Sequence, residues 1–275
     1  MNRAVLDGIT LEYEDSGTGE PVICIHGAFI ADTFRPLQFE RSIADRYRLI
    51  SYHRRGYVGS GPIAGTGSLA DEVHDCCALL SHLGVRLAHV IGHSFGGVVA
   101  LQLALEVPQL VHTLTLLEAA LVVGDSGPLY RQGLQQSVQR YREAGARVVA
   151  DEFLQMRWPG YREPLEKALP GAFEQAVADA PATFAADVPA ALNSRFGEEQ
   201  ASKITQPVLV VLGERSVALH PRFAETYQLL LDWLPNAEGF VLPRATHFLH
   251  LENPRDMAGA LADFYARHPL DEAAT

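Results

Sequence analysis

The feature that most constrains the fold of this chain is a single serine between a strand pattern and a helix pattern. The stretch from Val90 to Gly97 reads Val-Ile-Gly-His-Ser-Phe-Gly-Gly, and apolar helical residues follow it at once. A chain that passes from strand to helix through one serine makes a sharp, strained bend, which exposes the hydroxyl of Ser94. Gly92 and Gly96 leave room for that bend, because a side chain at either position would crowd it. The segment therefore predicts an α/β fold with a reactive hydroxyl at the end of a strand.

Short apolar runs alternate with helical patterns along most of the chain. This alternation is typical of a mostly parallel sheet covered by helices on both faces. The expected strands are Thr10–Glu14, Pro21–His26, Tyr47–Tyr52, Ala88–Gly92, Thr113–Glu118, Pro207–Gly213 and Gly239–Leu242. Cap and stop residues mark three helices, which are Ser68–Leu83, Val98–Glu106 and Pro254–Arg267.

One region interrupts this alternation. Between about residues 122 and 202 we expect no strand, and prolines separate the helical stretches Tyr130–Ala144, Ala146–Arg157, Arg162–Ala168 and Ala172–Ala178. Helices inserted between two core strands are expected to cover the carboxyl edge of the sheet, where ligands bind in open α/β folds. We therefore expect a core made of residues 1–121 and 203–275, with a helical cap over residues 122–202. A helical hairpin that only widens the fold is the alternative.

A second segment can assist the serine. A buried strand pattern ends in His26-Gly27, and a loop at this point can aim the backbone amide of Ala28 at the reacting oxygen. The amide of Phe95, at the start of the helix after Ser94, is its natural partner in an oxyanion hole.

A late histidine is the candidate base. His247 follows the last expected strand and precedes the last helix, so its imidazole can take the proton of Ser94 and return it to a leaving group. The chain has eleven histidines, and most of them must be structural. His250 is the nearest rival, and His93 is expected to pack beside the serine.

These elements, in this order and over the whole chain, resemble the α/β-hydrolase superfamily. The resemblance implies the α/β-hydrolase fold with an inserted helical cap and a serine-histidine-acid triad. The segment from His53 to Ser60 is similar to the family's Asp-x-Arg-Gly-x-Gly-x-Ser loop. It has His53 in place of the aspartate and Val58 in place of a glycine, and we expect it to be structural.

The triad acid departs from the usual family pattern. Most members carry it after the strand that corresponds here to Val208–Leu212, where this chain has Ser216, which cannot stabilise an imidazolium. A subset of the superfamily, including zearalenone-type lactone hydrolases, carries the acid after the preceding strand, and Glu118 ends that strand here. We expect Glu118 to be the acid; Glu214 and Asp125 are the alternatives.

A serine nucleophile favours attack on a carbonyl carbon. With the resemblance, this predicts hydrolysis of an ester or lactone through an acyl-enzyme. An apolar or aromatic substrate is expected from the side chains that the pocket can use, which are Phe29, Tyr130, Met156, Trp158 and Phe184. A carbon–carbon bond hydrolase for dienoic acids is the main alternative, with Arg157 or Arg195 in the pocket. Perhydrolases, cofactor-independent oxygenases and a hydrolase-fold ligand receptor with little turnover are the others.

Composition narrows the possible partners. The net charge is −11, so the surface repels nucleic acid and anionic membranes. No phosphate-binding loop, dinucleotide fingerprint or ligand-spaced His/Cys cluster is present, so we expect no cofactor and no metal. Three cysteines form no disulfide pattern, and neither a secretion signal nor a membrane span is evident. We expect a cytoplasmic monomer or homodimer that acts on a small molecule.

Overall fold

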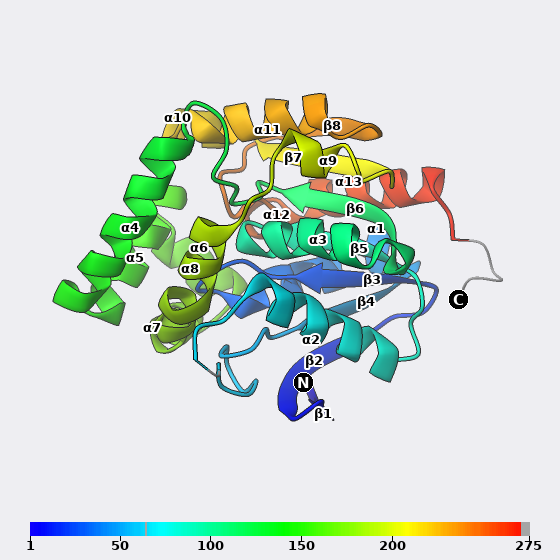
Figure 1. The fold of residues 1–275 in the computed structure, drawn as a ribbon. Coiled ribbons are helices and arrows are strands. Elements are labelled where there is room, and N and C mark those ends of the chain that lie inside the picture. Colours follow the sequence, from blue (N-terminus) through cyan, green and yellow to red (C-terminus); the bar gives the residue numbers. More distant parts are fainter. Residues whose placement is uncertain (64, 271–275) are drawn as a thin grey trace.

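The computed structural model describes residues 1–63 and 65–270, and a single sheet forms its centre (Figure 1). The eight strands lie in the order β1-β2-β4-β3-β5-β6-β7-β8. Strands β1 and β2 pair antiparallel, as do β2 and β4, and the other neighbours pair in parallel. The strands are β1 (Asn2–Leu6), β2 (Ile9–Ser16), β3 (Glu20–Ile25), β4 (Tyr47–Tyr52), β5 (Ala88–His93), β6 (Val111–Leu117), β7 (Val208–Gly213) and β8 (Ala237–Leu242).

All seven expected strands are present, and the α/β class with a mostly parallel sheet is confirmed. The additional strand is β1, which the sequence analysis did not predict. Only Ala4 and Leu6 of this strand are buried, so its apolar alternation is too short to indicate a strand alone. Its pairing with β2 supplies the missing stabilisation.

Helices cover both faces of the sheet. Consecutive residues of a strand point to opposite faces, and in β5 the side chain of Val90 packs in one core cluster while that of Ile91 packs in another. The first cluster includes α2 (Leu69–His82), α3 (Phe95–Glu106) and α11 (Arg222–Trp233); the second includes α1 (Arg41–Ala44) and α13 (Pro254–Arg267). Further short helices are η1 (Ala31–Phe39), η2 (Pro108–Leu110), α10 (Ser216–Leu219) and α12 (Leu249–Glu252).

The segment between β6 and β7 is helical, as expected for residues 122–202. It holds α4 (Gly127–Ala144), α5 (Ala146–Arg157), α6 (Arg162–Ala168), α7 (Ala172–Ala182), the π-helical turn η3 (Thr183–Asp187), α8 (Val188–Asn193) and α9 (Glu198–Ala201). We call residues 122–202 the helical insert. In Figure 1 the arrowheads of β3 and β6 point toward α4–α8, so these helices stand at the carboxyl end of the sheet.

The expected end of one insert helix, at Ala178, is wrong. Helix α7 continues to Ala182 although it contains Pro181. A proline removes one backbone hydrogen bond from a helix, and the wider π-helical turn η3 that follows adapts the chain to that loss. In this chain a proline near the end of a helical pattern marks a change of helix type and not the end of the helix.

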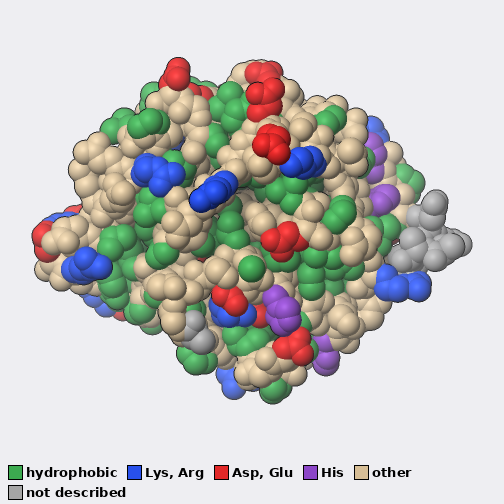
Figure 2. Space-filling model, viewed as in Figure 1, with side chains coloured by type: hydrophobic (Ala, Val, Ile, Leu, Met, Phe, Trp, Pro, Cys, Tyr) green, Lys and Arg blue, Asp and Glu red, His purple; other side chains and the backbone are tan. Residues whose placement is uncertain are grey.

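The surface carries both signs of charge. On the face drawn in Figure 2, acidic and basic side chains are interspersed among hydrophobic ones. Within the described ranges, every helix is too short or too polar to cross a lipid bilayer.

Candidate active site

Ser94 occupies the bend between β5 and α3 and has a strained backbone. Its φ is 53° and its ψ is −115°, a region that residues with a side chain rarely adopt. Glycines make the bend possible. A Cβ atom on Gly96 would lie 2.0 Å from the carbonyl oxygen of Ile25, and one on Gly92 would lie 2.4 Å from the carbonyl oxygen of Gly96. The serine is thus fixed at the carboxyl end of the central strand.

The end of β6 adjoins this bend. The backbone N–H of Ser94 donates to the carbonyl oxygen of Leu117, at 2.9 Å. The next residue, Glu118, lies just beyond the strand and also has a left-handed backbone, with φ 46°. Its N–H donates to the carbonyl oxygen of Val211, at 3.2 Å. Two neighbouring strands therefore hold the serine and the carboxylate at the same edge.

Three side chains that the sequence predicts to be catalytic form a hydrogen-bonded chain. The Ser94 hydroxyl oxygen lies 3.0 Å from Nε2 of His247, and Nδ1 of His247 lies 2.7 Å from Oε2 of Glu118. The other carboxylate oxygen of Glu118 accepts the backbone N–H of Gly213, at 2.8 Å. With the Nδ1 proton donated to the carboxylate, Nε2 is left to accept the hydroxyl proton.

The electrostatics of this chain follow from burial. Burial raises the pKa of Glu118 to about 7, against the opposing effects of the Ser216 hydroxyl, the Gly213 amide and the charge of Arg222. Burial also lowers the pKa of His247 well below its ordinary range, and the nearby charges of Arg157 and Arg222 lower it further. The imidazole of His247 is therefore neutral near pH 7, which is the form able to accept a proton.

The predicted oxyanion amides lie beside the serine. Ala28 and Phe95 both line the cavity that contains Ser94. Phe95 is the first residue of α3, so its amide has no acceptor within the helix. The loop after β3 lies directly against the bend, because a Cβ atom on Gly27 would be 3.0 Å from the Cβ of Ser94.

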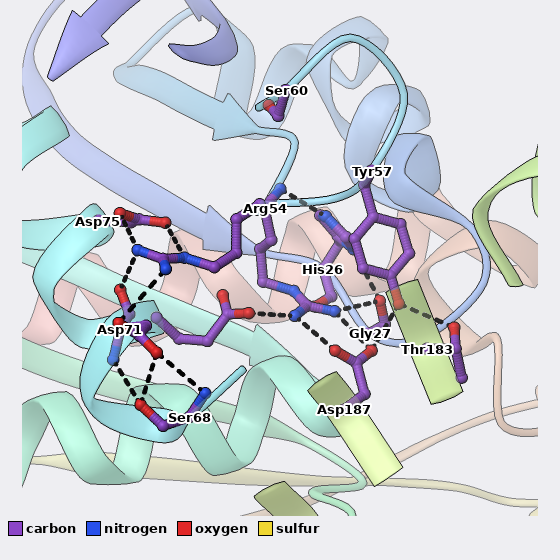
Figure 3. Close-up of polar contacts among 12 residues, drawn as sticks. His26, Gly27, Arg54, Tyr57, Ser60, Ser68, Asp71, Asp75, Thr183 and Asp187 are labelled. Carbon is purple, nitrogen blue, oxygen red and sulfur yellow. Dashed lines mark hydrogen bonds and ion pairs between the residues drawn. The ribbon is translucent and has the colours of Figure 1, made fainter. Parts of the chain in front are cut away.

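A buried arginine holds this loop in place. Arg54 donates to the carbonyl oxygens of His26 and Gly27, each at 3.1 Å. Its guanidinium also pairs with Asp187 of the helical insert, at 2.8 and 2.9 Å, and with Glu72 of α2, at 3.0 Å. Figure 3 shows the guanidinium between the loop and Asp187. The segment that the sequence analysis expected to be structural thus connects the loop of Gly27 to the insert.

The alternative acids and bases lie elsewhere. The carboxylate of Glu214 accepts the backbone N–H of Arg244, at 2.7 Å, and Asp125 is exposed. His250 is buried against the ring of Phe34, with centroids 4.4 Å apart. His93 packs beside the bend and pairs through Nε2 with the carbonyl oxygen of His247, at 2.8 Å. In the described part of the chain, no cluster of three or more His, Cys, Asp or Glu side chains is arranged to hold a metal ion.

A cavity of about 820 Å³ opens over Ser94, between the sheet edge and the helical insert. Four of the five predicted pocket residues line it, which are Phe29, Tyr130, Met156 and Phe184. Trp158 does not, because its ring packs against that of Phe248, with centroids 5.9 Å apart. Of the two arginines weighed for the pocket, Arg157 lines the cavity and Arg195 does not.

Arg222 and Phe223 also line the cavity, from the start of α11, and were not among the pocket residues predicted from the sequence. The ring of Phe223 packs against the imidazole of His247, with centroids 5.2 Å apart. The amphipathic stretch Arg222–Trp233 after Pro221 is a signal for this helix, since a proline commonly precedes or opens a helix.

Comparison with known sequences gives a family match. A family profile described as "alpha/beta hydrolase fold" matches residues 20–254. RutD of Azorhizobium caulinodans, provisionally named a carbamate hydrolase, is 35% identical over 106 residues, which cover 38% of this chain and 40% of that protein. BpoC of Mycobacterium tuberculosis, provisionally named a non-heme bromoperoxidase, is 29% identical, covering 94% of this chain and 98% of its own. The 2-hydroxymuconate semialdehyde hydrolase of Pseudomonas putida is 26% identical, covering 94% and 92%.

The solved structures that share the fold include two named enzymes. A thermophilic esterase from Thermogutta terrifontis superimposes with a TM-score of 0.84 at 22% identity, covering 98% of this chain and 100% of the esterase. An enol-lactonase from Burkholderia xenovorans gives a TM-score of 0.79 at 18% identity, covering 96% and 100%.

Proposed function

The chain belongs to the α/β-hydrolase family and is a hydrolase of that fold, and from this premise we propose that it cleaves carboxylic esters or lactones of apolar or aromatic small molecules. The observation that carries the proposal is the chain of hydrogen bonds from Ser94 through His247 to Glu118. Ser94, at one end of this chain, lines a mostly apolar cavity. This geometry suits a nucleophile, its base and the acid that orients the base.

The proposed reaction has two acyl-transfer steps. Ser94 attacks the carbonyl carbon while His247 takes the hydroxyl proton and returns it to the leaving oxygen. Water, deprotonated by the same imidazole, then attacks the acyl-enzyme, and the proton returns to Ser94. Negative charge on the carbonyl oxygen is met by the amides of Ala28 and Phe95, and each such donor contributes about 3 kcal/mol to lowering the barrier. Glu118 stabilises the imidazolium in both steps.

Named relatives support this class of reaction. The esterase and the enol-lactonase share the fold, and the carbonyl chemistry that their names describe is the chemistry that a serine nucleophile favours. The Pseudomonas putida hydrolase favours a second candidate, a carbon–carbon bond hydrolase. In this chain the presence of Arg157 in the cavity wall supports the second candidate, because its cation suits an acidic substrate.

The helical insert fits the role of a cap domain over residues 122–202, with residues 1–121 and 203–275 as the catalytic core. Residues of α4, α5, η3 and α8 line the cavity opposite Ser94, as a cap that selects substrates requires. The cysteines Cys24, Cys76 and Cys77 are all free thiols, which suits a reducing cytoplasm. We also propose that the protein acts as a monomer or a homodimer.

A panel of 4-nitrophenyl esters, aryl lactones and a dienoic ketoacid tests the proposal. Wild-type protein should turn over esters or lactones repeatedly, and Ser94→Ala should lose that activity while keeping its far-ultraviolet spectrum and melting temperature. Cleavage of the ketoacid alone would favour the carbon–carbon candidate. A burst of a single turnover, or activity that survives in Ser94→Ala, would contradict the proposed enzyme.

A further inference from the structure

We propose that the cavity selects substrates that carry a carboxylate group, and that Arg157 and Arg222 form the subsite that holds it. This inference rests on the proposed function and adds a chemical class of substrate to it. Both arginines line the cavity that contains Ser94, one at the end of α5 and the other at the start of α11.

The guanidinium of Arg157 stacks on an aromatic wall of the cavity. Its central carbon lies 3.7 Å from the ring centroid of Phe153. The ring of Phe153 in turn packs against that of Phe29, with centroids 4.4 Å apart, and Phe29 directly follows the predicted oxyanion residue Ala28. Burial lowers the pKa of Arg157 to about 10, so the side chain stays charged near pH 7 in a site where the charge is poorly solvated.

Arg222 lies close to the predicted base and near Arg157, because the charges of the two arginines act on each other and both act on His247. The guanidinium of Arg222 sits 4.1 Å from the ring centroid of Phe223 and 4.2 Å from that of Tyr130, and the residue is only 5% exposed. Since the ring of Phe223 packs on the imidazole of His247, this charge lies one aromatic ring away from the reacting atoms. Arg157 and Arg222 therefore place two cations in the wall of the cavity that contains Ser94.

The carboxylates around the cavity are already used by other groups. Asp187 pairs with Arg54, at 2.8 Å, and Glu152 pairs with Arg140, at 2.7 Å. Glu143 accepts the side-chain amide of Gln139, at 2.7 Å.

The nearest acid on α11 is committed in the same way. The carboxylate of Glu225 accepts the backbone amides of Asp125 and Ser126, at 2.5 and 2.9 Å. Among the residues that the structure describes, neither Arg157 nor Arg222 forms an ion pair with a carboxylate.

Arg222 interacts with the Glu118 carboxylate without forming an ion pair, and Arg157 has no carboxylate partner among the described residues. Burying two such cations is costly, and a bound anion reduces that cost. A carboxylate suits them best, because the planar fork of a guanidinium donates two parallel hydrogen bonds to its two oxygens. The cavity of about 820 Å³ leaves space for a small acid in addition to the ester group. The aromatic rings under both arginines hold the forks in place; the fork of Arg157 also donates to the side chain of Tyr130 and to the carbonyl oxygen of Phe153, at 3.5 Å.

The subsite also affects the base. The charges of Arg157 and Arg222 lower the pKa of His247 and so oppose formation of the imidazolium that catalysis requires. A substrate carboxylate bound between the arginines neutralises this effect when the proton must be taken. Substrates that carry a carboxylate should therefore have a higher kcat as well as a lower KM than their neutral counterparts.

Matched pairs of esters test the subsite. The first pair is mono(4-nitrophenyl) glutarate and 4-nitrophenyl valerate, in which only the acyl chain differs in charge. The second is 4-acetoxybenzoate and its methyl ester, in which only the leaving group differs. In at least one pair, we expect the wild-type kcat/KM for the acid to exceed that for its neutral partner by about 10- to 100-fold. This ratio corresponds to the contribution of one or two charge-assisted hydrogen bonds.

Arg157→Gln and Arg222→Gln should each reduce that preference at least about tenfold. Because both charges also act on His247, activity toward the neutral ester changes as well, and the acid-to-neutral ratio of kcat/KM is the measure of the subsite. Arg157→Lys should retain part of the preference. Arg147→Gln is the matched control, because Arg147 lies at the other end of α5, is exposed and pairs with Glu174. It should leave the preference at the wild-type value.

The outcomes separate the two proposals. Ser94-dependent hydrolysis with no preference for the acid in either pair overturns the subsite and leaves the proposed function standing. Equal loss on acid and neutral ester in the arginine variants also overturns it, because it assigns the arginines to supporting the triad. Activity that persists in Ser94→Ala overturns the proposed function instead.

A binding measurement keeps the subsite testable without turnover. By calorimetry, Ser94→Ala should bind 4-phenylbutyrate at least about tenfold more tightly than 4-phenylbutanamide. Equal affinity for the two overturns the proposal.

Discussion

Nδ1 of His247 lies 2.7 Å from a carboxylate oxygen of Glu118, which follows β6 rather than β7. Glu118→Gln keeps the size of the side chain but removes the charge that stabilises an imidazolium. We expect kcat on a 4-nitrophenyl ester to fall by about 10⁴-fold, the scale known for the loss of a triad acid in a serine protease. Circular dichroism of the variant should match that of the wild type.

Glu214→Gln is the control for this prediction. Glu214 follows β7, where most of the family carries its acid, but its carboxylate accepts the backbone N–H of Arg244. We expect kcat within about threefold of wild type, since surface substitutions away from a site usually have small effects. The reverse result, a large loss for Glu214→Gln and none for Glu118→Gln, would show that the acid has been assigned to the wrong strand.

The hydrogen-bonded pair of Glu118 and His247 predicts how kcat/KM depends on pH. Glu118 has a pKa raised to about 7 by burial, so it gains its charge as the pH rises through that value, whereas His247 stays neutral across this range. We expect kcat/KM to increase with pH through about 7 and then to level off, with an apparent pKa that belongs to the coupled pair. The measurement is a kcat/KM profile from about pH 5 to 9. In Glu118→Gln the rise of kcat/KM through about pH 7 should disappear. A wild-type profile that is flat across the range contradicts the prediction.

The parts of the site that the sequence predicted depend on local pattern. The bend at Ser94 needs glycine on both sides because backbone atoms approach within 2.4 Å of the position of a Cβ atom. Such a steric requirement is visible in a few consecutive residues. Glu118 was predictable for a similar reason, because a lone acid at the end of a buried strand must face the carboxyl edge of the sheet.

The parts that the sequence did not predict depend on tertiary packing. Trp158 and Met156 have the same apolar character and lie two residues apart, yet Trp158 packs on Phe248 and only Met156 lines the cavity. Arg222 reaches the cavity because α11 begins beside His247, which no local pattern shows. The direction of one side chain on an insert helix depends on neighbours that are distant in sequence.

Breaking the buried ion pair of Arg54 should affect both stability and catalysis. Asp187→Ala leaves a fully buried guanidinium without its bidentate partner, and we expect the free energy of unfolding to fall by about 3–5 kcal/mol. Because Arg54 also holds the carbonyl oxygens of His26 and Gly27, kcat should decrease as well. Urea unfolding and ester kinetics measure the two effects. Glu174→Ala, which breaks the exposed pair with Arg147, should leave both near wild type; equal effects of the two variants would contradict the prediction.

His53 should make stability depend on pH. It is buried between Glu12 and Asp32, with Asp179 nearby, and although burial opposes protonation, hydrogen bonds and charges of the two partners raise its pKa above the ordinary value. Folding therefore favours the protonated form. The stabilisation is complete below the unfolded-state pKa of about 6.5 and is lost as pH rises through the folded-state pKa.

His53→Gln should remove this part of the pH dependence. Melting temperatures of wild type and variant, compared between about pH 5.5 and 8.5, should differ most at the acid end and converge at the alkaline end. A constant difference across the range would mean that His53 stabilises the fold through packing alone.

Two glycine-to-alanine substitutions with opposite expected signs test whether the bend at Ser94 requires close backbone contact. In Gly96→Ala the new Cβ would lie 2.0 Å from the carbonyl oxygen of Ile25, so β3 and the loop after it must move away from Ser94. We expect a loss of about 3 kcal/mol in the free energy of unfolding, together with loss of ester hydrolysis. Gly259→Ala in α13 meets no atom within 4 Å, and alanine there should stabilise the helix by about 0.5–1 kcal/mol without changing kcat. Chemical denaturation of both variants measures the two signs. A Gly96→Ala protein as stable and as active as wild type would mean that the loop carrying Ala28 is not held against the serine, and the assignment of that amide to the oxyanion hole would be lost with it.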